Sequence, residues 1–273
     1  MKSFKFGLLG YGKMGKALVE GLICQGFIEE GNLFVYTPNS SSRAKVDHPG
    51  LTICQDASAM CDQSDIILMA VKPQVLPNEI IELRNHLKNK VIISMAAGIS
   101  TENLIAMVDP STQVIRIMPN LAVEVEKGVI LLSKAHNLDP ENFNICAVMF
   151  AKLGLVLLID EAKMDIGSVL IGSGPAFIAY FINAMKLGAA DQFSEEETFN
   201  MLYQTVIGTI AYLQKNKIQP NELINRVCSP NGSTIEGIKS LKDHGVEDQI
   251  VQAIQQSETR AKTLGNIKLF KKD

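Results

Sequence analysis

Short apolar runs alternate with helix-like segments over about the first 160 residues of the chain. Turn-prone polar, glycine or proline residues separate many of these runs, as is typical of buried strands. Candidate strands cover residues 4–9, 33–36, 66–71, 91–95, 114–118, 128–132 and 155–158, and helical segments between them include residues 17–25, 77–87 and 101–107. This alternation predicts an α/β fold with a doubly wound parallel sheet that helices cover on both faces.

Strand patterns stop after about residue 159, and the remaining chain has the pattern of helices. The predicted helices cover residues 161–170, 175–188, 195–214, 220–227, 232–241 and 246–264. Ser194 and Glu197 are placed as a capping box for the longest of them. The shift in composition predicts a boundary near Asp160, with an α/β domain at residues 1–160 and an all-α domain at residues 161–273.

One predicted helix is apolar on more than one face. Residues 176–182 read Ala-Phe-Ile-Ala-Tyr-Phe-Ile without a charge. A helix that is apolar all round is buried in a large core or against another chain. Because few residues remain to cover this surface, we expect a homo-oligomer.

Composition excludes several classes of partner. The net charge is −3 over 273 residues, and the sequence has no basic stripe, so neither a nucleic acid nor a membrane surface is expected as a partner. The five cysteines lack C-x-x-C spacing and the four histidines lie far apart, which indicates reduced thiols and no metal site. No leader and no run of about 18 apolar residues is present, so we expect a soluble, cytoplasmic protein that acts on small molecules.

A glycine-rich turn follows the first candidate strand. Gly10, Gly12 and Gly15 stand in the order G-x-G-x-x-G between that strand and a helix, the context in which the pattern predicts dinucleotide binding. Gly10 is expected to permit the turn, Gly12 to admit a pyrophosphate and Gly15 to let the helix pack closely. The pyrophosphate would lie at the helix N-terminus. The alternative is a glycine turn without a ligand.

The end of the second strand bears on the choice of cofactor. The run Tyr36-Thr37-Pro38-Asn39-Ser40-Ser41-Ser42-Arg43 has no acid for a ribose hydroxyl, and its hydroxyls, amide and arginine suit a 2′-phosphate. NADP is therefore favoured, with NAD possible, against the alternative of a plain polar turn.

Two more segments lie at carboxyl ends of predicted strands, the edge where open α/β sheets bind ligands. They are Ala70-Val71-Lys72-Pro73 and, one strand later, Ala96-Ala97, whose small side chains leave room for a cofactor. Either segment is alternatively an ordinary strand end.

Two runs in the helical half are candidates for binding. Gly172-Ser173-Gly174-Pro175 interrupts a predicted helix, either as a kink that presents N–H groups to a ligand or as a helix junction with Pro175 in the first turn. Ser229-Pro230-Asn231-Gly232-Ser233-Thr234-Ile235 precedes another helix, where it either binds an anion such as a carboxylate or caps the helix through Ser229 or Ser233.

Taken together, these segments resemble pyrroline-5-carboxylate reductase over nearly the whole chain. The resemblance rests on Gly7 to Gly15, Ala70 to Gln74, Ser94 to Gly98, Arg116-Ile117-Met118-Pro119-Asn120, Gly172 to Phe177 and Ser229 to Ile235. It implies a Rossmann domain, an all-α dimerisation domain that interleaves with its partner, and an active site between one subunit's cofactor and the other's helices. The implied reaction reduces 1-pyrroline-5-carboxylate to proline, the last step of proline biosynthesis.

The resemblance also implies roles for individual residues. The cofactor would contact Leu9, Gly10, Tyr11, Gly12, Lys13, Met14, Asn39, Ser40, Ala70, Val71, Lys72, Pro73, Ala96 and Ala97. The substrate would contact Gly174, Asn231, Gly232, Ser233 and Thr234. Ser168 would be the hydroxyl near the imine nitrogen, whereas a helix serine is more commonly bonded to its own backbone.

Several positions depart from the family pattern. They are Pro38-Asn39, Ala57, Leu121, Ala122, Ile171 and Asn231, which replaces a glycine. These departures leave open a non-catalytic or regulatory paralogue of the same fold. A related imine or keto-acid reductase is the other alternative, for which Lys186 is a nominal catalytic residue.

Overall fold

The computed structural model describes residues 4–29, 31–38, 50–189 and 192–264. The chain forms two compact units, one of Met1–Gly172 with Ser257–Asp273 and one of Ser173–Gln256. Compactness thus places residues 161–172 and the described residues 257–264 in the unit that holds the sheet. The domain division after residue 160 stays a prediction.

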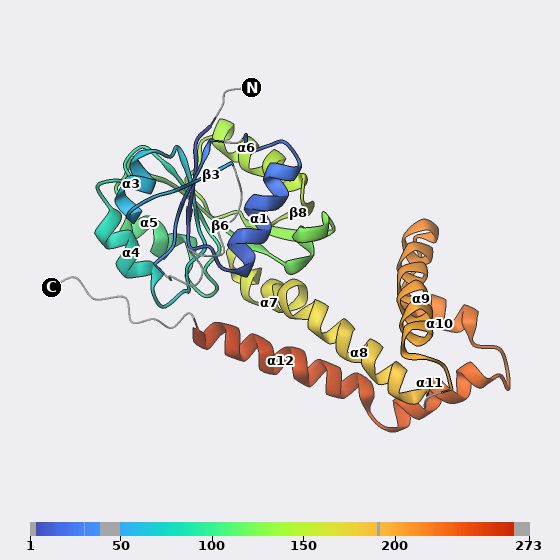
Figure 1. The fold of residues 1–273 in the computed structure, drawn as a ribbon. Helices are drawn as coiled ribbons and strands as arrows, with labels where there is room; N and C mark the ends of the chain where they lie inside the picture. Colours follow the sequence, from blue (N-terminus) through green and yellow to red (C-terminus); the bar gives the residue numbers. More distant parts are fainter. Residues whose placement is uncertain (1–3, 30, 39–49, 190–191, 265–273) are drawn as a thin grey trace. The chain divides into compact units, whose positions relative to one another are not determined.

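An eight-stranded sheet forms the centre of the first unit (Figure 1). Its strands stand in the spatial order β3-β2-β1-β4-β5-β6-β7-β8. In chain order they are β1 (Phe6–Leu9), β2 (Leu33–Tyr36), β3 (Leu51–Ile53), β4 (Ile66–Met69), β5 (Val91–Ser94), β6 (Gln113–Pro119), β7 (Gly128–Ser133) and β8 (Gly154–Ile159). The predicted doubly wound α/β fold is confirmed, and the edge strand β3 was missed because it has only three residues.

One pair of neighbours departs from the expected parallel sheet. Strands β6 and β7 pair antiparallel, with Ile117 opposite Leu132, while all other neighbours are parallel. Only residues 120–127, with the 3₁₀ turn η1 (Leu121–Val125), join these two strands. A parallel crossover needs a dozen or more residues, so this connection forces the chain to reverse.

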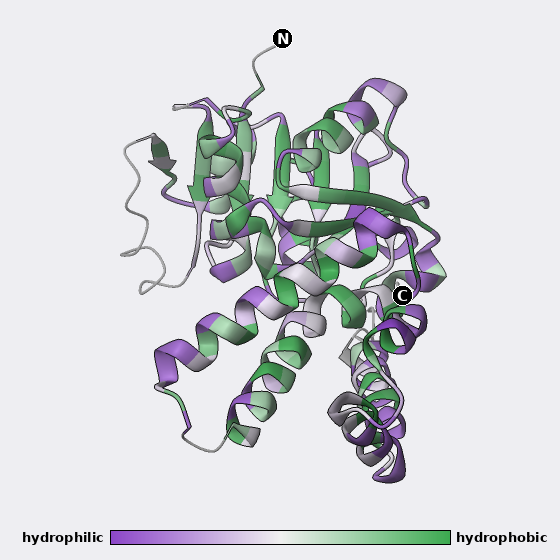
Figure 2. Cartoon of the chain, turned by 90° about the vertical axis from the view of Figure 1, so that its right-hand side faces the viewer, coloured by the Kyte–Doolittle hydropathy of each residue, from purple (hydrophilic) through white to green (hydrophobic). Residues whose placement is uncertain are grey.

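Alternation along the strands divides the core between the two faces of the sheet. Leu8 and Leu68 pack on one face, whereas Leu9 and Met69 pack on the other. The helices around the sheet are α1 (Lys13–Cys24), α3 (Ala57–Asp62), α4 (Leu76–Leu83), α5 (Thr101–Met107) and α6 (Pro140–Ala151). Figure 2 shows the strands as largely hydrophobic, as expected for a sheet buried on both faces.

The chain leaves the sheet through a turn and a composite helix. The 3₁₀ turn η2 (Glu161–Lys163) is followed by α7 (Met164–Ser168), a π-helical turn η3 (Val169–Ser173) and α8 (Gly174–Gly188). The glycine and proline run therefore does not break the helix, because a π turn accommodates it and Pro175 lies in the first turn of α8. Glu161–Gly188 is long and apolar enough to cross a membrane by length and composition alone, a weak criterion that core helices also meet.

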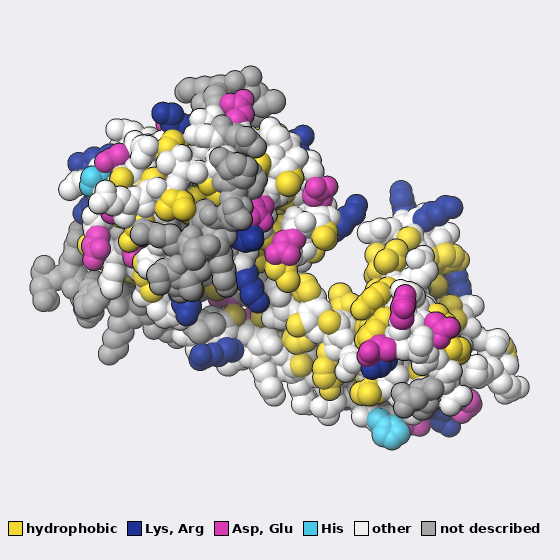
Figure 3. Space-filling model, in the orientation of Figure 1, with side chains coloured by type: hydrophobic (Ala, Val, Ile, Leu, Met, Phe, Trp, Pro, Cys, Tyr) yellow, Lys and Arg dark blue, Asp and Glu magenta, His cyan; other side chains and the backbone are white. Residues whose placement is uncertain are grey.

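Helices alone make up the described part of the second unit. After α8 come α9 (Glu195–Asn216), α10 (Pro220–Val227), α11 (Ser233–Asp243) and α12 (Val246–Leu264), whose last turns belong to the first unit. The capping box of Ser194 and Glu197 is present. Hydrophobic side chains gather on the surface of α8 and α9, as Figure 3 shows, among them Ile178, Tyr180, Phe181, Ile207 and Ile210.

Candidate cofactor and substrate sites

The glycine turn after β1 is packed against the segment that follows β4. Gly10 has a φ of +97°, and a Cβ on it would lie 2.9 Å from the carbonyl oxygen of Ala70. The Ala70 N–H donates to the carbonyl oxygen of Leu9 at 2.8 Å, and this hydrogen bond holds the Ala70 backbone next to the turn. Gly10 therefore performs the turn role predicted for it.

Helix α1 crosses close above this turn. A Cβ on Gly15 would lie 2.6 Å from the Gly10 carbonyl oxygen and 2.9 Å from the Ala70 Cβ, so glycine sets the distance between helix and strand. Gly12 differs, because a Cβ added to it would have nothing within 4 Å and its φ of −82° suits any residue. The fold thus requires Gly10 and Gly15, while Gly12 leaves open space at the helix start.

The N-terminus of α1 fits a dinucleotide pyrophosphate. Gly12 is its N-cap, no side chain caps the helix, and its first turn has no acidic residue. By contrast, α3, α5 and α6 are capped by the side chains of Asp56, Ser100 and Asp139. Lys13 is exposed beside the open N–H groups of α1. Unpaired N–H groups with a positive helix end favour an anion.

Tyr11 stabilises the glycine turn from inside. Its ring is buried, and its hydroxyl donates to the Glu20 Oε1 at 2.9 Å. Burial, followed by the hydrogen bond to Glu20, raises the pKa of Tyr11 above its ordinary value. The side chain is therefore part of the core, which leaves its backbone as the group available to a ligand.

The other predicted cofactor segments follow neighbouring strands. Strands β1, β4 and β5 are adjacent and parallel, so Gly10, Ala70 and Ala96 come to the same edge of the sheet. Ala96 is 1% exposed and packs in the core, whereas Ala97 is half-buried. Lys72 is exposed. Ala97 and the segment after β4 are thus better placed than Ala96 to meet a ligand directly.

Asn39 and Ser40, predicted for the adenosine end of the cofactor, lie outside the described residues. The described chain reaches the buried Thr37 and the exposed Pro38 at this point.

Ser168 ends α7 within the first unit. Its Oγ donates to the carbonyl oxygen of Asp165 at 2.7 Å, the backbone bond that is common for helix serines. The side chain is half-buried. Since this bond uses the hydroxyl proton, the oxygen lone pairs are left to accept.

The start of α11 is built around a left-handed residue. Asn231 has a φ of +60°, which glycine adopts most readily and asparagine more readily than other residues. Its replacement of the family's glycine is therefore compatible with this turn. A Cβ on Gly232 would overlap the Ser229 Oγ and lie 3.1 Å from the Ser229 carbonyl oxygen, so a larger residue would displace the serine side chain.

No side chain caps α11, whose N-cap is Gly232. The alternative of simple capping by Ser229 or Ser233 is therefore wrong. Ser233 and Thr234 are exposed in the first turn, beside N–H groups that can face an anion. Gly174, the other predicted substrate contact, begins α8 and is half-buried.

Lys186, the nominal lysine of the alternative reductases, is held by its neighbours. Its Nζ lies 2.6 Å from the Glu195 Oε1 and 5.6 Å from the centre of the Phe199 ring. These contacts account for the side chain without a catalytic role.

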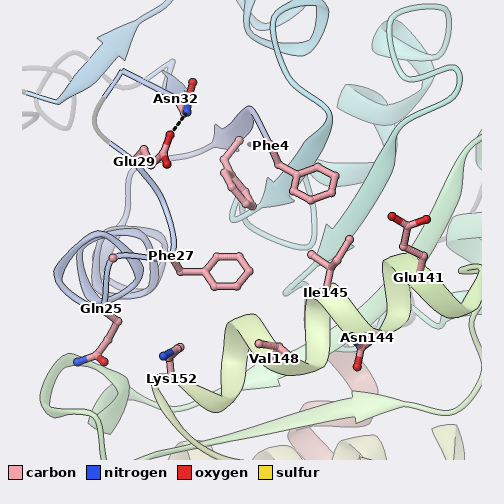
Figure 4. Close-up of a pocket in the computed structure, with 12 residues that line it drawn as sticks. Phe4, Gln25, Phe27, Glu29, Asn32, Glu141, Asn144, Ile145, Val148 and Lys152 are labelled. Carbon is pink, nitrogen blue, oxygen red and sulfur yellow. Dashed lines mark hydrogen bonds between the residues drawn. The ribbon is translucent and has the colours of Figure 1, made fainter. Parts of the chain in front are cut away.

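A pocket of about 640 Å³ lies at the opposite edge of the sheet. Phe4, Phe27 and Ile145 face one another across it, and Asn32 donates to Glu29 at its rim (Figure 4). None of the predicted cofactor or substrate residues lines it. Within the described ranges, no group of three or more His, Cys, Asp or Glu side chains is placed to hold a metal ion.

Arg116 has no individual role among the predictions from sequence, although it lies in one of the family motifs. It is 3% exposed in β6 and contacts Glu161 and Asp165. The signal available in the sequence was an arginine within a strand that is otherwise apolar at its centre.

Comparisons with known proteins agree with these features. Residues 161–264 match the family model for pyrroline-5-carboxylate reductase dimerisation, and residues 5–98 match that for NADP oxidoreductase, coenzyme F420-dependent. Pyrroline-5-carboxylate reductase of Methanosarcina acetivorans is 33% identical, over 97% of this chain and 99% of that protein. The chain belongs to the pyrroline-5-carboxylate reductase family.

Two further relatives support the same assignment. Pyrroline-5-carboxylate reductase of Aquifex aeolicus is 31% identical, over 96% of this chain and 98% of that protein. The crystal structure of Plasmodium falciparum pyrroline carboxylate reductase with NADP bound has a TM-score of 0.89 at 26% identity, covering 97% of this chain and 100% of that one. The family has a nicotinamide dinucleotide as its cofactor, and the cradle at α1 fits one.

Proposed function

We propose that this protein reduces 1-pyrroline-5-carboxylate to L-proline, the last step of proline biosynthesis, with NADPH as the preferred reductant. The observation that carries this proposal is an intact dinucleotide cradle, Gly10 to Gly15 with the uncapped α1, in a chain that matches the reductase family over nearly all of its residues. When bound, the reduced nicotinamide supplies a hydride.

The residues of the first unit hold and orient the cofactor. The N–H groups at the start of α1 bind the pyrophosphate, and the small side chain of Ala97 with the segment Ala70 to Pro73 leaves space at the edge of the sheet. Because the ring imine is protonated, hydride addition to its carbon gives the secondary amine of proline directly. The chain therefore needs chiefly to position two reactants and to exclude water.

Ser168 is proposed to meet the imine nitrogen. Its hydroxyl proton is committed to the Asp165 carbonyl, so its oxygen can accept a hydrogen bond from the protonated nitrogen. A hydrogen bond to a charged group is stronger than a neutral one, and it would orient the imine carbon. This role needs neither a buried base nor a catalytic dyad.

The start of α11 is proposed to hold the substrate carboxylate. Support comes from its glycine N-cap, the absence of a side-chain cap and the two exposed hydroxyls of Ser233 and Thr234. Asn231, Gly232 and Gly174 would shape the same site. We further propose that the active protein is a cytoplasmic homodimer, in which one subunit's cofactor faces helices of the other.

The dimer proposal is supported by the match of residues 161–264 to the dimerisation model and by the exposed apolar side chains of α8 and α9. Large contiguous apolar patches are rare on soluble monomers and mark protein–protein interfaces. The segment Glu161–Gly188 lies entirely within this match, which favours a protein partner over a membrane for its apolar side chains.

One assay tests the function: oxidation of NADPH, followed with 1-pyrroline-5-carboxylate and then with other cyclic imines and keto acids. The proposal expects turnover on the first substrate, with NADH less effective. Binding of NADPH without turnover on any substrate would favour a non-catalytic paralogue. Turnover confined to the other compounds would favour a related imine or keto-acid reductase.

A further inference from the structure

A buried arginine joins the sheet to the helix that carries Ser168. Arg116 of β6 has a side chain that is 4% exposed. Its Nη1 donates to the Glu161 Oε1 at 2.7 Å, and its Nη2 donates to the Asp165 Oδ1 at 3.2 Å. Glu161 begins η2 and Asp165 lies in the first turn of α7, so the guanidinium fixes the approach to α7 at two points.

Glu161 extends this connection to the segment after β5. The N–H and Oγ1 of Thr101 donate to Glu161 at 3.3 and 3.0 Å, and the Ser133 hydroxyl donates to the same carboxylate. Thr101 is the first residue of α5, and residues 95–100 before it contain the predicted cofactor contact Ala97. One carboxylate therefore links the end of this cofactor loop to the start of α7.

Two carboxylates set the orientation of the Arg116 guanidinium. The Arg116 Nε is buried and has no hydrogen-bond partner among the described residues, so only the two carboxylates orient the guanidinium. An orphaned buried donor is unfavourable, and a buried ion pair is often replaceable by apolar residues without loss of stability. A planar fork held by two carboxylates is, in contrast, well suited to fixing position.

Asp165 connects the cluster to the hydroxyl of Ser168. Its carboxylate accepts from Arg116, while its carbonyl oxygen accepts from the Ser168 Oγ. We propose that Arg116, Glu161 and Asp165 are positioning residues, which hold α7 and Ser168 in a fixed register against the cofactor loop 95–100. This inference rests on the proposed function, because it assigns Ser168 to the imine.

Kinetics of an Asp165→Ala variant test the proposal. The backbone carbonyl that orients Ser168 remains in this variant, so a lower kcat would come from the position of α7. Small displacements of positioned groups lower reaction rates strongly, so we expect kcat to fall roughly tenfold or more. The Kd for NADPH should stay within about twofold of wild type. The matched control is Asp160→Asn, which removes an exposed carboxylate paired with Lys134, and it should leave both values unchanged.

A double variant separates positioning from general stability. If Asp165 acts through Ser168, adding Asp165→Ala to Ser168→Ala should lower kcat little further. Independent, multiplicative losses would overturn the proposal, as would an unchanged kcat in Asp165→Ala.

Hydrogen exchange supplies a readout that does not depend on turnover. Glu161→Gln keeps the shape of the side chain and removes its charge. If this variant and Asp160→Asn have equal melting temperatures, the amides of residues 101–104 and 164–168 should still exchange faster in Glu161→Gln. Equal exchange in the two variants would overturn the positioning role. If wild type binds NADPH but reduces no imine, the proposed function is wrong. The exchange experiment still tests whether Glu161 holds these two segments in place, because it does not depend on turnover.

Discussion

The glycine turn gives a prediction in which three similar substitutions should have three different outcomes. Gly12→Ala adds a methyl group at a φ of −82° with nothing within 4 Å. Alanine is a poorer N-cap than glycine but restricts the unfolded chain, two effects of about 0.5–1 kcal/mol that oppose each other. The free energy of unfolding should therefore stay within about 1 kcal/mol of wild type.

The same methyl group should weaken cofactor binding. It would stand at the N-cap of α1, where the pyrophosphate approaches the first-turn N–H groups. Each hydrogen bond to a charged group contributes about 1.5–3 kcal/mol, and about 1.4 kcal/mol corresponds to a tenfold change in Kd. Loss of one such bond predicts a Kd for NADPH that is roughly 10–100 times higher, measurable by fluorescence titration.

Two companion variants test the structural part of the reasoning. Gly10→Ala places a Cβ at a φ of +97° and 2.9 Å from a backbone oxygen. Strain of about 1–3 kcal/mol and overpacking of about 1–3 kcal/mol should together destabilise it by at least about 2 kcal/mol. Gly26→Ala has a φ of +65° but nothing within 4 Å, so only strain of about 1–2 kcal/mol is expected.

Denaturant unfolding and NADPH titration on the same three samples decide the outcome. Wild-type affinity in Gly12→Ala would refute the placement of the pyrophosphate at α1. Equal stability of Gly10→Ala and Gly26→Ala would refute the close packing of the turn against Ala70.

Three further measurements follow from the structure. Ser168→Ala should lower kcat roughly 10–100-fold, the value of one hydrogen bond to a charged group, with NADPH affinity kept; equal kcat would exclude the imine contact. Thr234→Ala should raise the KM for the imino acid while sparing NADPH affinity, and equal damage to both would contradict the carboxylate site. Burial raises the pKa of Cys61 and Cys146 to about 12, so in the folded protein at about pH 9 mass spectrometry should find them unalkylated while the exposed Cys24 reacts.

Much of the fold follows from short-range patterns. The Ser194 capping box, the strand alternation and the glycine turn depend on residues a few positions apart, so the sequence displays them directly. Element ends moved by a few residues, and α1 begins at Lys13 rather than Ala17, because helix ends depend on the turn that precedes them. The family motifs located the candidate cofactor and substrate segments in the same way.

Contacts between segments that are distant in the sequence were decided only by the tertiary structure. The antiparallel β7 follows from how far a short connection can reach, and the π turn at residues 169–173 lets a glycine and proline run continue a helix that local propensity would end. Thr101, Arg116 and Glu161 meet although 45 or 60 residues separate Glu161 from the other two. Hydrogen bonds of this kind leave no periodic trace in the chain, since only folding of the sheet brings their partners within reach.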